Sequence, residues 1–425
     1  MSNEKFRLFG LEMKYFIPIV IIILGAGQLG LLPKGLVGIL PYMIIIGTIL
    51  DYIGNKLPIV KDYFGGGPIV IIFASAALVY YNVLSKDIID SVQNFMVKNT
   101  FLDFYIAALI VGSVLGMNRF LLIKASVRYL PVIIGGVIVS LLFTGTLGML
   151  LGHGFKESVF FIAIPIMGGG MGAGAVPLAQ IFGNALKQDP KDVLSVMVPA
   201  VALGNAVAIV FGGMLNKLGK KYPNLSGDGQ LLIDGGNSVK EEERILSPVE
   251  YKQLGIGILI ATSFFIFGRI LSKVIPIHSY ALMIISVAIA KMTGIIKQEY
   301  EECAFKWFQF VMTNFTGALL VGIGIAYTNL GQVIESFSFT YLILVLATVI
   351  GAIVGTAVVG KILRFYMVEA SITAGLCMAN MGGTGDVAVL SAANRMELMP
   401  FAQISSRLGG TFMLILTSIL IKIFG

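Results

Sequence analysis

Charged residues are scarce in this chain. Asp, Glu, Lys and Arg make up 12% of its 425 residues, whereas a soluble protein carries about 25%. No polar segment is long enough to bury a core of its own, which excludes a separate soluble domain. Cysteine occurs only twice, so a disulfide framework is excluded, and we expect Cys303 and Cys377 to be buried free thiols.

Motifs for several common chemistries are also missing. The sequence contains no phosphate-binding loop, no zinc motif and no arrangement typical of a nucleophilic triad. ATP-driven transport and hydrolysis therefore have no support, and we expect no enzyme, no catalytic residue and no cofactor. The formal charge of +7 does not indicate nucleic-acid binding, because the basic residues lie in loops between apolar spans.

Long apolar stretches are abundant and predict an all-α polytopic membrane protein embedded in the lipid bilayer. A span needs about 20 mostly apolar residues. Eleven stretches meet this requirement, and we read the first as an uncleaved helix rather than a signal peptide. The predicted spans are 13–32, 36–55, 67–85, 101–117, 130–152, 193–216, 251–273, 278–297, 308–330, 337–360 and 399–423.

Two further apolar segments each contain a Gly-Gly-x-Gly cluster. The first glycine segment, 157–186, contains Gly169, Gly170 and Gly172; the second, 365–396, contains Gly382, Gly383 and Gly385. We predict re-entrant hairpins that enter and leave the membrane on the same side. Broken apolar segments at matching places in two halves point to the substrate site of a transporter. The alternative is that the glycines only allow helices to pack closely.

The distribution of Lys and Arg supports this count. With the N-terminus in the cytoplasm and the C-terminus outside, twenty of the thirty basic residues lie on the cytoplasmic side and nine outside. This is the bias expected of a membrane protein. We assign residues 1–35 to a tail and an extra helix, 36–216 to a first repeat, 217–250 to a flexible cytoplasmic linker, and 251–425 to a second, inverted repeat.

Arg407 is the basic residue left over, because it lies inside the last predicted span. A charge at membrane depth is costly and usually marks a substrate or ion path. The planar guanidinium also fits a carboxylate with two hydrogen bonds. The alternatives are a structural pair with Asp386 or Glu369, or a side chain that reaches the interface.

Asp386 directly follows the second glycine cluster and needs a partner at that depth. Together with Asn380, Thr384, Ser405 and Ser406 it supplies hard oxygen ligands that suit an alkali cation. The alternative is a cap on the following half-helix. Glu369, Arg395 and Glu397 flank the second glycine segment, and we expect surface pairs there.

The chain resembles the 2-hydroxycarboxylate transporter family, bacterial carriers of citrate, malate and related acids. The resemblance covers nearly the whole chain and is densest over 380–410, which includes both the second glycine cluster and Arg407. It implies a homodimer in the inner membrane, two inverted five-helix repeats with one extra N-terminal helix, and an elevator motion of a transport domain.

The resemblance also implies roles for individual residues. Arg407 should bind a substrate carboxylate, with the remaining substrate contacts made by Gly383, Thr384, Ser406, Met171 and Gly172. A sodium site should lie among Met378, Asn380, Thr384, Asp386 and Ser406, with Ser405 beside it.

Two departures from the family pattern bear on the substrate. Citrate-selective sodium symporters have a second arginine where this chain has Met381, and an asparagine where it has Met171. We therefore predict sodium-coupled symport of malate, with citrate accepted more weakly. Proton-coupled symport and malate/product exchange are the alternatives within transport. An alternative from another functional class is the membrane subunit of a sodium-pumping decarboxylase.

Overall fold

The computed structural model describes residues 7–58, 67–116, 119, 128–233, 248–275, 279–331, 334, 338–395 and 398–424. Helices dominate this part of the chain, and the strands there are the short antiparallel pair β1 (Arg7–Leu8) and β2 (Leu11–Glu12). Cys303 and Cys377 are both buried and free, as expected.

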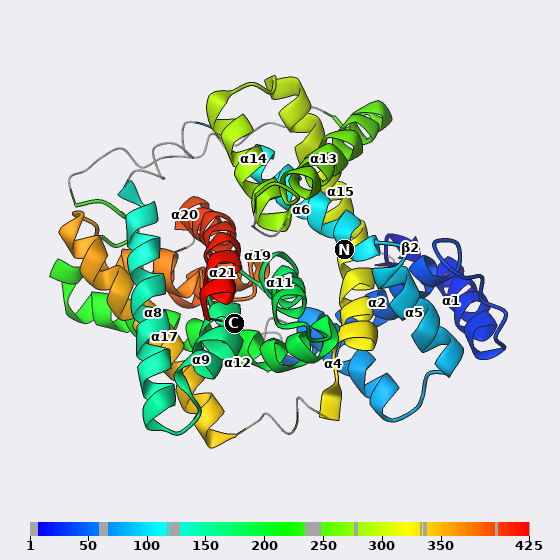
Figure 1. Cartoon of the computed structure of the whole chain (residues 1–425), viewed down its shortest axis with the longest axis horizontal. Helices are drawn as coiled ribbons and strands as arrows, with labels where there is room; N and C mark the ends of the chain where they lie inside the picture. Colours follow the sequence, from blue (N-terminus) through cyan, green and yellow to red (C-terminus); the bar gives the residue numbers. More distant parts are fainter. Residues whose placement is uncertain are drawn as a thin grey trace, which may run out of the picture.

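One group of helices comes from the N-terminal part of the chain and from the region after the linker. These helices pack on one another around α15, and in Figure 1 they occupy the right-hand side and the top of the view. They are α1 (Met13–Gln28), α2 (Ile39–Lys56), α4 (Gly67–Tyr80), α5 (Lys86–Val97), α6 (Phe101–Gly116), α13 (Tyr251–Leu271), α14 (Ser279–Thr293), α15 (Gln298–Gly322) and its π-helical continuation η4 (Ile323–Tyr327).

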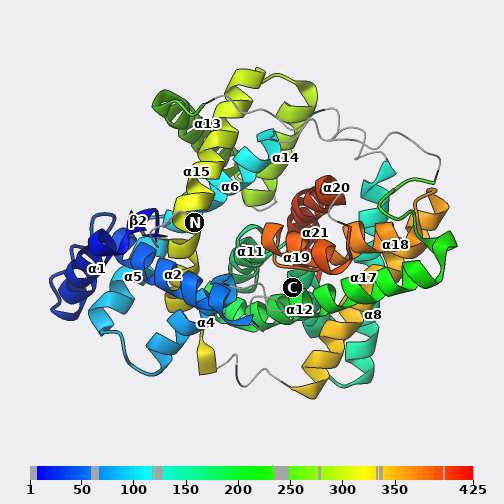
Figure 2. The same ribbon diagram turned by 180° about the vertical axis from the view of Figure 1, so that it is seen from behind.

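The second group contains both glycine segments and packs around α12 and α17. Figure 2 shows α12 running beneath α11, α19 and α21. The members outside the glycine segments are α8 (Leu130–Leu150), α12 (Pro190–Lys221), η3 (Pro223–Leu225), α17 (Phe339–Ile362), α20 (Met399–Ile404), η7 (Ser405–Gly409) and α21 (Gly410–Phe424).

A helix lies in each of the eleven predicted spans. Among the described residues, six helical stretches are long and apolar enough to cross a membrane by themselves: 130–150, 190–221, 251–271, 298–327, 339–362 and 401–423. A seventh is possible where α5 and α6 meet at a bend of 43°. The chain is therefore a polytopic membrane protein, and the number eleven stays a prediction because the other helices are shorter or less apolar.

Two features differ from the sequence prediction. Helix α5 was not expected, because it is amphipathic and buries only one face, which includes Val92 and Phe95. The predicted flexible linker begins instead as the regular end of α12, and residues 222–233 then make defined contacts with the start of the second glycine segment. The prediction of flexibility is wrong for 217–233, while 234–247 lie outside the described residues.

Candidate functional site

Both glycine segments are helices broken at their glycine clusters. The first consists of α9 (Phe155–Ser158), η1 (Val159–Ala163) and α10 (Ile164–Ile166), a turn, then η2 (Met171–Ala175) and α11 (Val176–Leu186). The second consists of α18 (Met367–Ala370) and η5 (Ser371–Leu376), a turn, then α19 (Gly383–Ala392). The turns need glycine, because φ is +114° at Gly170 and +86° at Gly382, values that other residues rarely adopt.

The two glycine turns lie against each other. A methyl group added to Gly170 would lie 2.9 Å from the peptide nitrogen of Gly382 and from the carbonyl oxygen of Met381. Added to Gly382, it would lie 3.4 Å from the carbonyl oxygen of Gly169. The backbones therefore meet with no room for a side chain at Gly170, although more than 200 residues separate the two turns in the sequence.

A carboxylate lies directly behind this contact. Asp386, in the first turn of α19, is fully buried. Its Oδ1 accepts a hydrogen bond from Asn380 Nδ2 at 2.9 Å, and its Oδ2 accepts one from Ser406 Oγ at 2.7 Å. Cys377 is a third hydrogen-bond partner of this carboxylate. An ionised carboxylate can accept about four hydrogen bonds, so acceptor capacity remains for a cation.

Two asparagines hold the second turn in place. Asn380 Oδ1 accepts the N–H of Gly382 at 2.8 Å, and Asn205 Oδ1 accepts the N–H of Met381 at 3.1 Å. Asn205 is a fully buried polar residue within α12. The sequence analysis missed it, although an asparagine in the middle of an apolar span was a readable signal.

The π-helical turn η7, between α20 and α21, lies beside Asp386 and the first glycine turn. Such turns are rare and occur frequently at functional sites. Ser406 donates from this turn to Asp386, while Ser405 Oγ lies 2.9 Å from Tyr129 Oη. A methyl group on Gly169 would overlap with the carbonyl oxygen of Ser406, so the first glycine turn packs directly on η7.

Arg407 lies in η7, beside Ser406, and is half-buried. The preceding residue, Ser406, donates a hydrogen bond to Asp386, so Arg407 and Asp386 are near one another. This is compatible both with substrate binding and with the structural pairing left open above. The N-terminal turn of α19 adds peptide N–H groups and a partial positive charge on the same side.

The other predicted site residues fall around this junction. Met171, Met378 and Met381 are buried, and Met378 packs on Gly409. Gly172 faces the first helix group, since a methyl group on it would lie 3.8 Å from Leu319 and 3.9 Å from Tyr105. Gly383 begins α19, while the side chain of Thr384 lies outside the described part of the chain.

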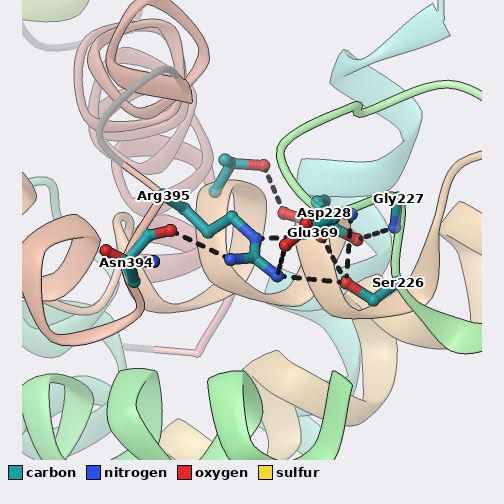
Figure 3. A network of polar contacts seen from close by, with 7 residues as sticks. Ser226, Gly227, Asp228, Glu369, Asn394 and Arg395 are labelled. Atoms are coloured by element: carbon teal, nitrogen blue, oxygen red, sulfur yellow. Dashed lines mark hydrogen bonds and ion pairs between the residues drawn. The ribbon is translucent and has the colours of Figure 1, made fainter. Parts of the chain in front are cut away.

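Glu369 and Arg395 require a correction. They form the expected pair, with 3.2 Å between Arg395 Nε and Glu369 Oε1, but they are not on the surface: both are almost completely buried (Figure 3). Linker residues 226–228 cover this pair. Neighbouring residues in the sequence do not reveal this contact, because the linker is more than 100 positions away. Glu397 lies outside the described residues.

The junction combines features for an anion with features for a cation. A guanidinium and helix N–H groups suit a carboxylate, and carboxylate, hydroxyl and amide oxygens suit a hard cation such as sodium. Among the described residues, no group of three His, Cys, Asp or Glu side chains could hold a metal ion. A cation here would therefore depend on one carboxylate together with neutral oxygens.

Comparisons with known proteins find one matching family and several similar transporters. The profile of the 2-hydroxycarboxylate transporter family matches residues 8–419. The Na(+)-malate symporter of Bacillus subtilis is 39% identical over 96% of this chain and 91% of its own length. Malate transporter MleP of Lactococcus lactis is 38% identical over 99% of both chains. The citrate/sodium symporter of Salmonella typhimurium is 35% identical over 98% of this chain and 94% of its own.

Proposed function

Because the chain belongs to the 2-hydroxycarboxylate transporter family, we propose that it is a secondary transporter that carries malate into the cell together with sodium. The observation that carries this proposal is the contact between the two glycine turns beside Asp386 and Arg407. The relatives support transport rather than an enzymatic activity.

Malate is the proposed substrate because a single guanidinium serves this site. Arg407 binds one carboxylate through its planar fork, and the N-terminal turn of α19 receives the other. Met381 gives no second cationic donor for a third carboxylate. The relatives named for malate are slightly more similar to this chain than the one named for citrate, at 39% and 38% against 35% identity.

Sodium is the proposed coupling ion, with Asp386, Asn380, Ser406, Ser405 and Met378 as its surroundings. Malate is a dianion, and moving one charge across 100 mV costs about 2.3 kcal/mol. Uptake into a negative cell therefore costs about 4–5 kcal/mol, which two cations cancel. The name of the Bacillus subtilis relative includes sodium and supports this assignment.

Transport follows an elevator mechanism in this proposal, within a homodimer in the inner membrane. The second helix group, with both glycine turns, moves past the first group, which stays fixed. The position of Gly172 supports this division, since this proposed substrate residue faces Tyr105 and Leu319 of the first group.

The test is uptake of labelled malate by the purified chain in proteoliposomes, with a sodium gradient imposed at constant pH. We expect uptake to follow the sodium gradient. Uptake that follows only a proton gradient, or only malate or product inside the vesicles, would assign proton-coupled symport or exchange instead. No malate movement without a biotin-carrying partner would favour the decarboxylase subunit.

A further inference from the structure

A second polar cluster lies at the base of the second glycine segment, the end remote from the glycine turn. Glu369 is in α18, and Arg395 follows α19, so their ion pair closes the two arms of the segment on each other. The side chains are 0% and 3% exposed, respectively. The proposed transport chemistry uses neither residue.

Residues 226–233, which we name the strap, cover this pair. Ser226 Oγ donates to Glu369 Oε1 at 2.7 Å, and the Gly227 N–H donates to Oε2 at 2.9 Å. Asp228 adds an ion pair with Arg395, with 3.0 Å between Oδ1 and Nη2. Figure 3 shows these groups converging from the linker, from α18 and from the end of α19.

The strap also pairs with the segment through its backbone. The N–H of Tyr366 donates to the carbonyl of Leu231, and the N–H of Ile233 donates to the carbonyl of Arg364, both at 3.0 Å. Leu232 and Phe365 form an antiparallel bridge between these two bonds. The strap is therefore held by main-chain and side-chain contacts together.

Helix α12 and its continuation thus hold the second glycine segment at both ends. Within α12, Asn205 holds the turn through the N–H of Met381. Between the two ends, a methyl group on Gly212 would lie 3.0 Å from the carbonyl oxygen of Val389 in α19. After α12 ends at Lys221, the chain returns as the strap to hold the base.

From this arrangement we infer that the strap is a permanent clamp, which stays bound while the site binds and releases its ligands. The second glycine segment then cannot open by hinging at its base, and moves as one body with α12 and the strap. This inference goes beyond the proposed function, because it assigns residues 226–233 the role of holding the base of the segment closed, whatever the transported ligand is.

The physical reason is the burial of the charged pair. Opening the strap would remove two hydrogen-bond donors from the Glu369 carboxylate and leave buried charges with incomplete partners, which is strongly destabilising. The Asp228 contact contributes little by comparison, since its side chain is 90% exposed and exposed ion pairs are weak. Arg395→Gln leaves the buried Glu369 carboxylate without its charged partner and removes the Arg395 hydrogen bond to Ser226 Oγ, so it should loosen the strap. Asp228→Asn serves as the matched control.

Hydrogen exchange in the full-length protein tests this clamp independently of transport. We expect peptides covering 226–233 and 364–369 to exchange slowly, with a change within about twofold when malate and sodium are added. Arg395→Gln should speed exchange at least about tenfold, and Asp228→Asn should stay close to the wild type. Acceleration of the wild-type strap by the ligands would overturn the inference, as would an unchanged rate in Arg395→Gln.

A reversible disulfide provides the second test. Leu232 and Phe365 are paired across the bridge, so the double variant Leu232→Cys, Phe365→Cys should lock the strap when oxidised. We expect malate uptake by the oxidised and reduced forms to agree within about twofold, with the parent chain given the same oxidant as control. Uptake that is lost on oxidation and restored by reduction would overturn the clamp. Absence of uptake in the untreated parent would instead refute the proposed function, and hydrogen exchange would still decide the clamp.

Discussion

At the scale of single residues, the site depends on a few polar side chains that lie far apart in the sequence. Asp386 and Ser406 were identifiable because charged and hydroxyl groups stand out in apolar segments. The role of Asn205 was not, because its partner Met381 is 176 positions away. A single sequence reveals unusual residues at a given depth, whereas pairing across such distances depends on the fold.

Substrate selection at this scale is attributed to Met381, which is buried beside the two turns. Met381→Arg adds a second planar donor, so we expect the ratio of citrate to malate uptake to rise about tenfold, which corresponds to about 1.4 kcal/mol. Met381→Leu keeps the apolar character and is the control. A well-folded Met381→Arg protein with the wild-type ratio would refute this explanation of selectivity.

Cation coupling is attributed to Asp386. Asp386→Asn keeps the shape of the side chain but removes its charge, so sodium loses the only carboxylate in its proposed surroundings. We expect the sodium concentration for half-maximal malate uptake to increase at least about tenfold. Asp90→Asn, at an exposed position of α5, controls for loss of negative charge. An unchanged sodium dependence would exclude Asp386 from the cation site.

At the scale of elements, the two glycine turns are the features that the sequence predicted most usefully. The repeated Gly-Gly-x-Gly clusters predicted broken helices, and breaks occur at both places. Their contact could not be derived, because nothing in either cluster specifies the other as its neighbour. Amphipathic α5 and the docked strap were missed for a related reason. The apolar face of α5 and the polar groups of the strap contact residues that are distant in the sequence.

The contact between the turns should not tolerate a side chain. Gly170→Ala places a methyl group 2.9 Å from the second turn and forces a non-glycine residue to φ +114°, where strain alone costs about 1–3 kcal/mol. We expect malate uptake to fall at least about tenfold while the protein remains helical by circular dichroism. Gly255→Ala, which meets no atom within 4 Å, should transport normally. Equal activities of the two variants would show that the close approach is unnecessary.

At the scale of the whole molecule, composition alone was sufficient to predict a helical membrane protein, because 12% charged residues cannot cover a soluble surface of this size. The division of the helices into two groups could not be predicted from composition. Helices α13 to α15 follow the linker yet pack with α2 and α6 from the start of the chain. This grouping provides the proposed division into a fixed part and a moving part.

The central claim is that the two turns and Arg407 together bind a small dicarboxylate. Its most direct test is equilibrium binding of malate to the purified protein with sodium present, for the wild type, for Arg407→Ala and for Arg269→Ala, an exposed control in α13. The account predicts that Arg407→Ala loses about 2–5 kcal/mol of binding free energy, at least about 30-fold in affinity, and that Arg269→Ala binds as the wild type. Unchanged malate affinity in a folded Arg407→Ala protein would contradict it.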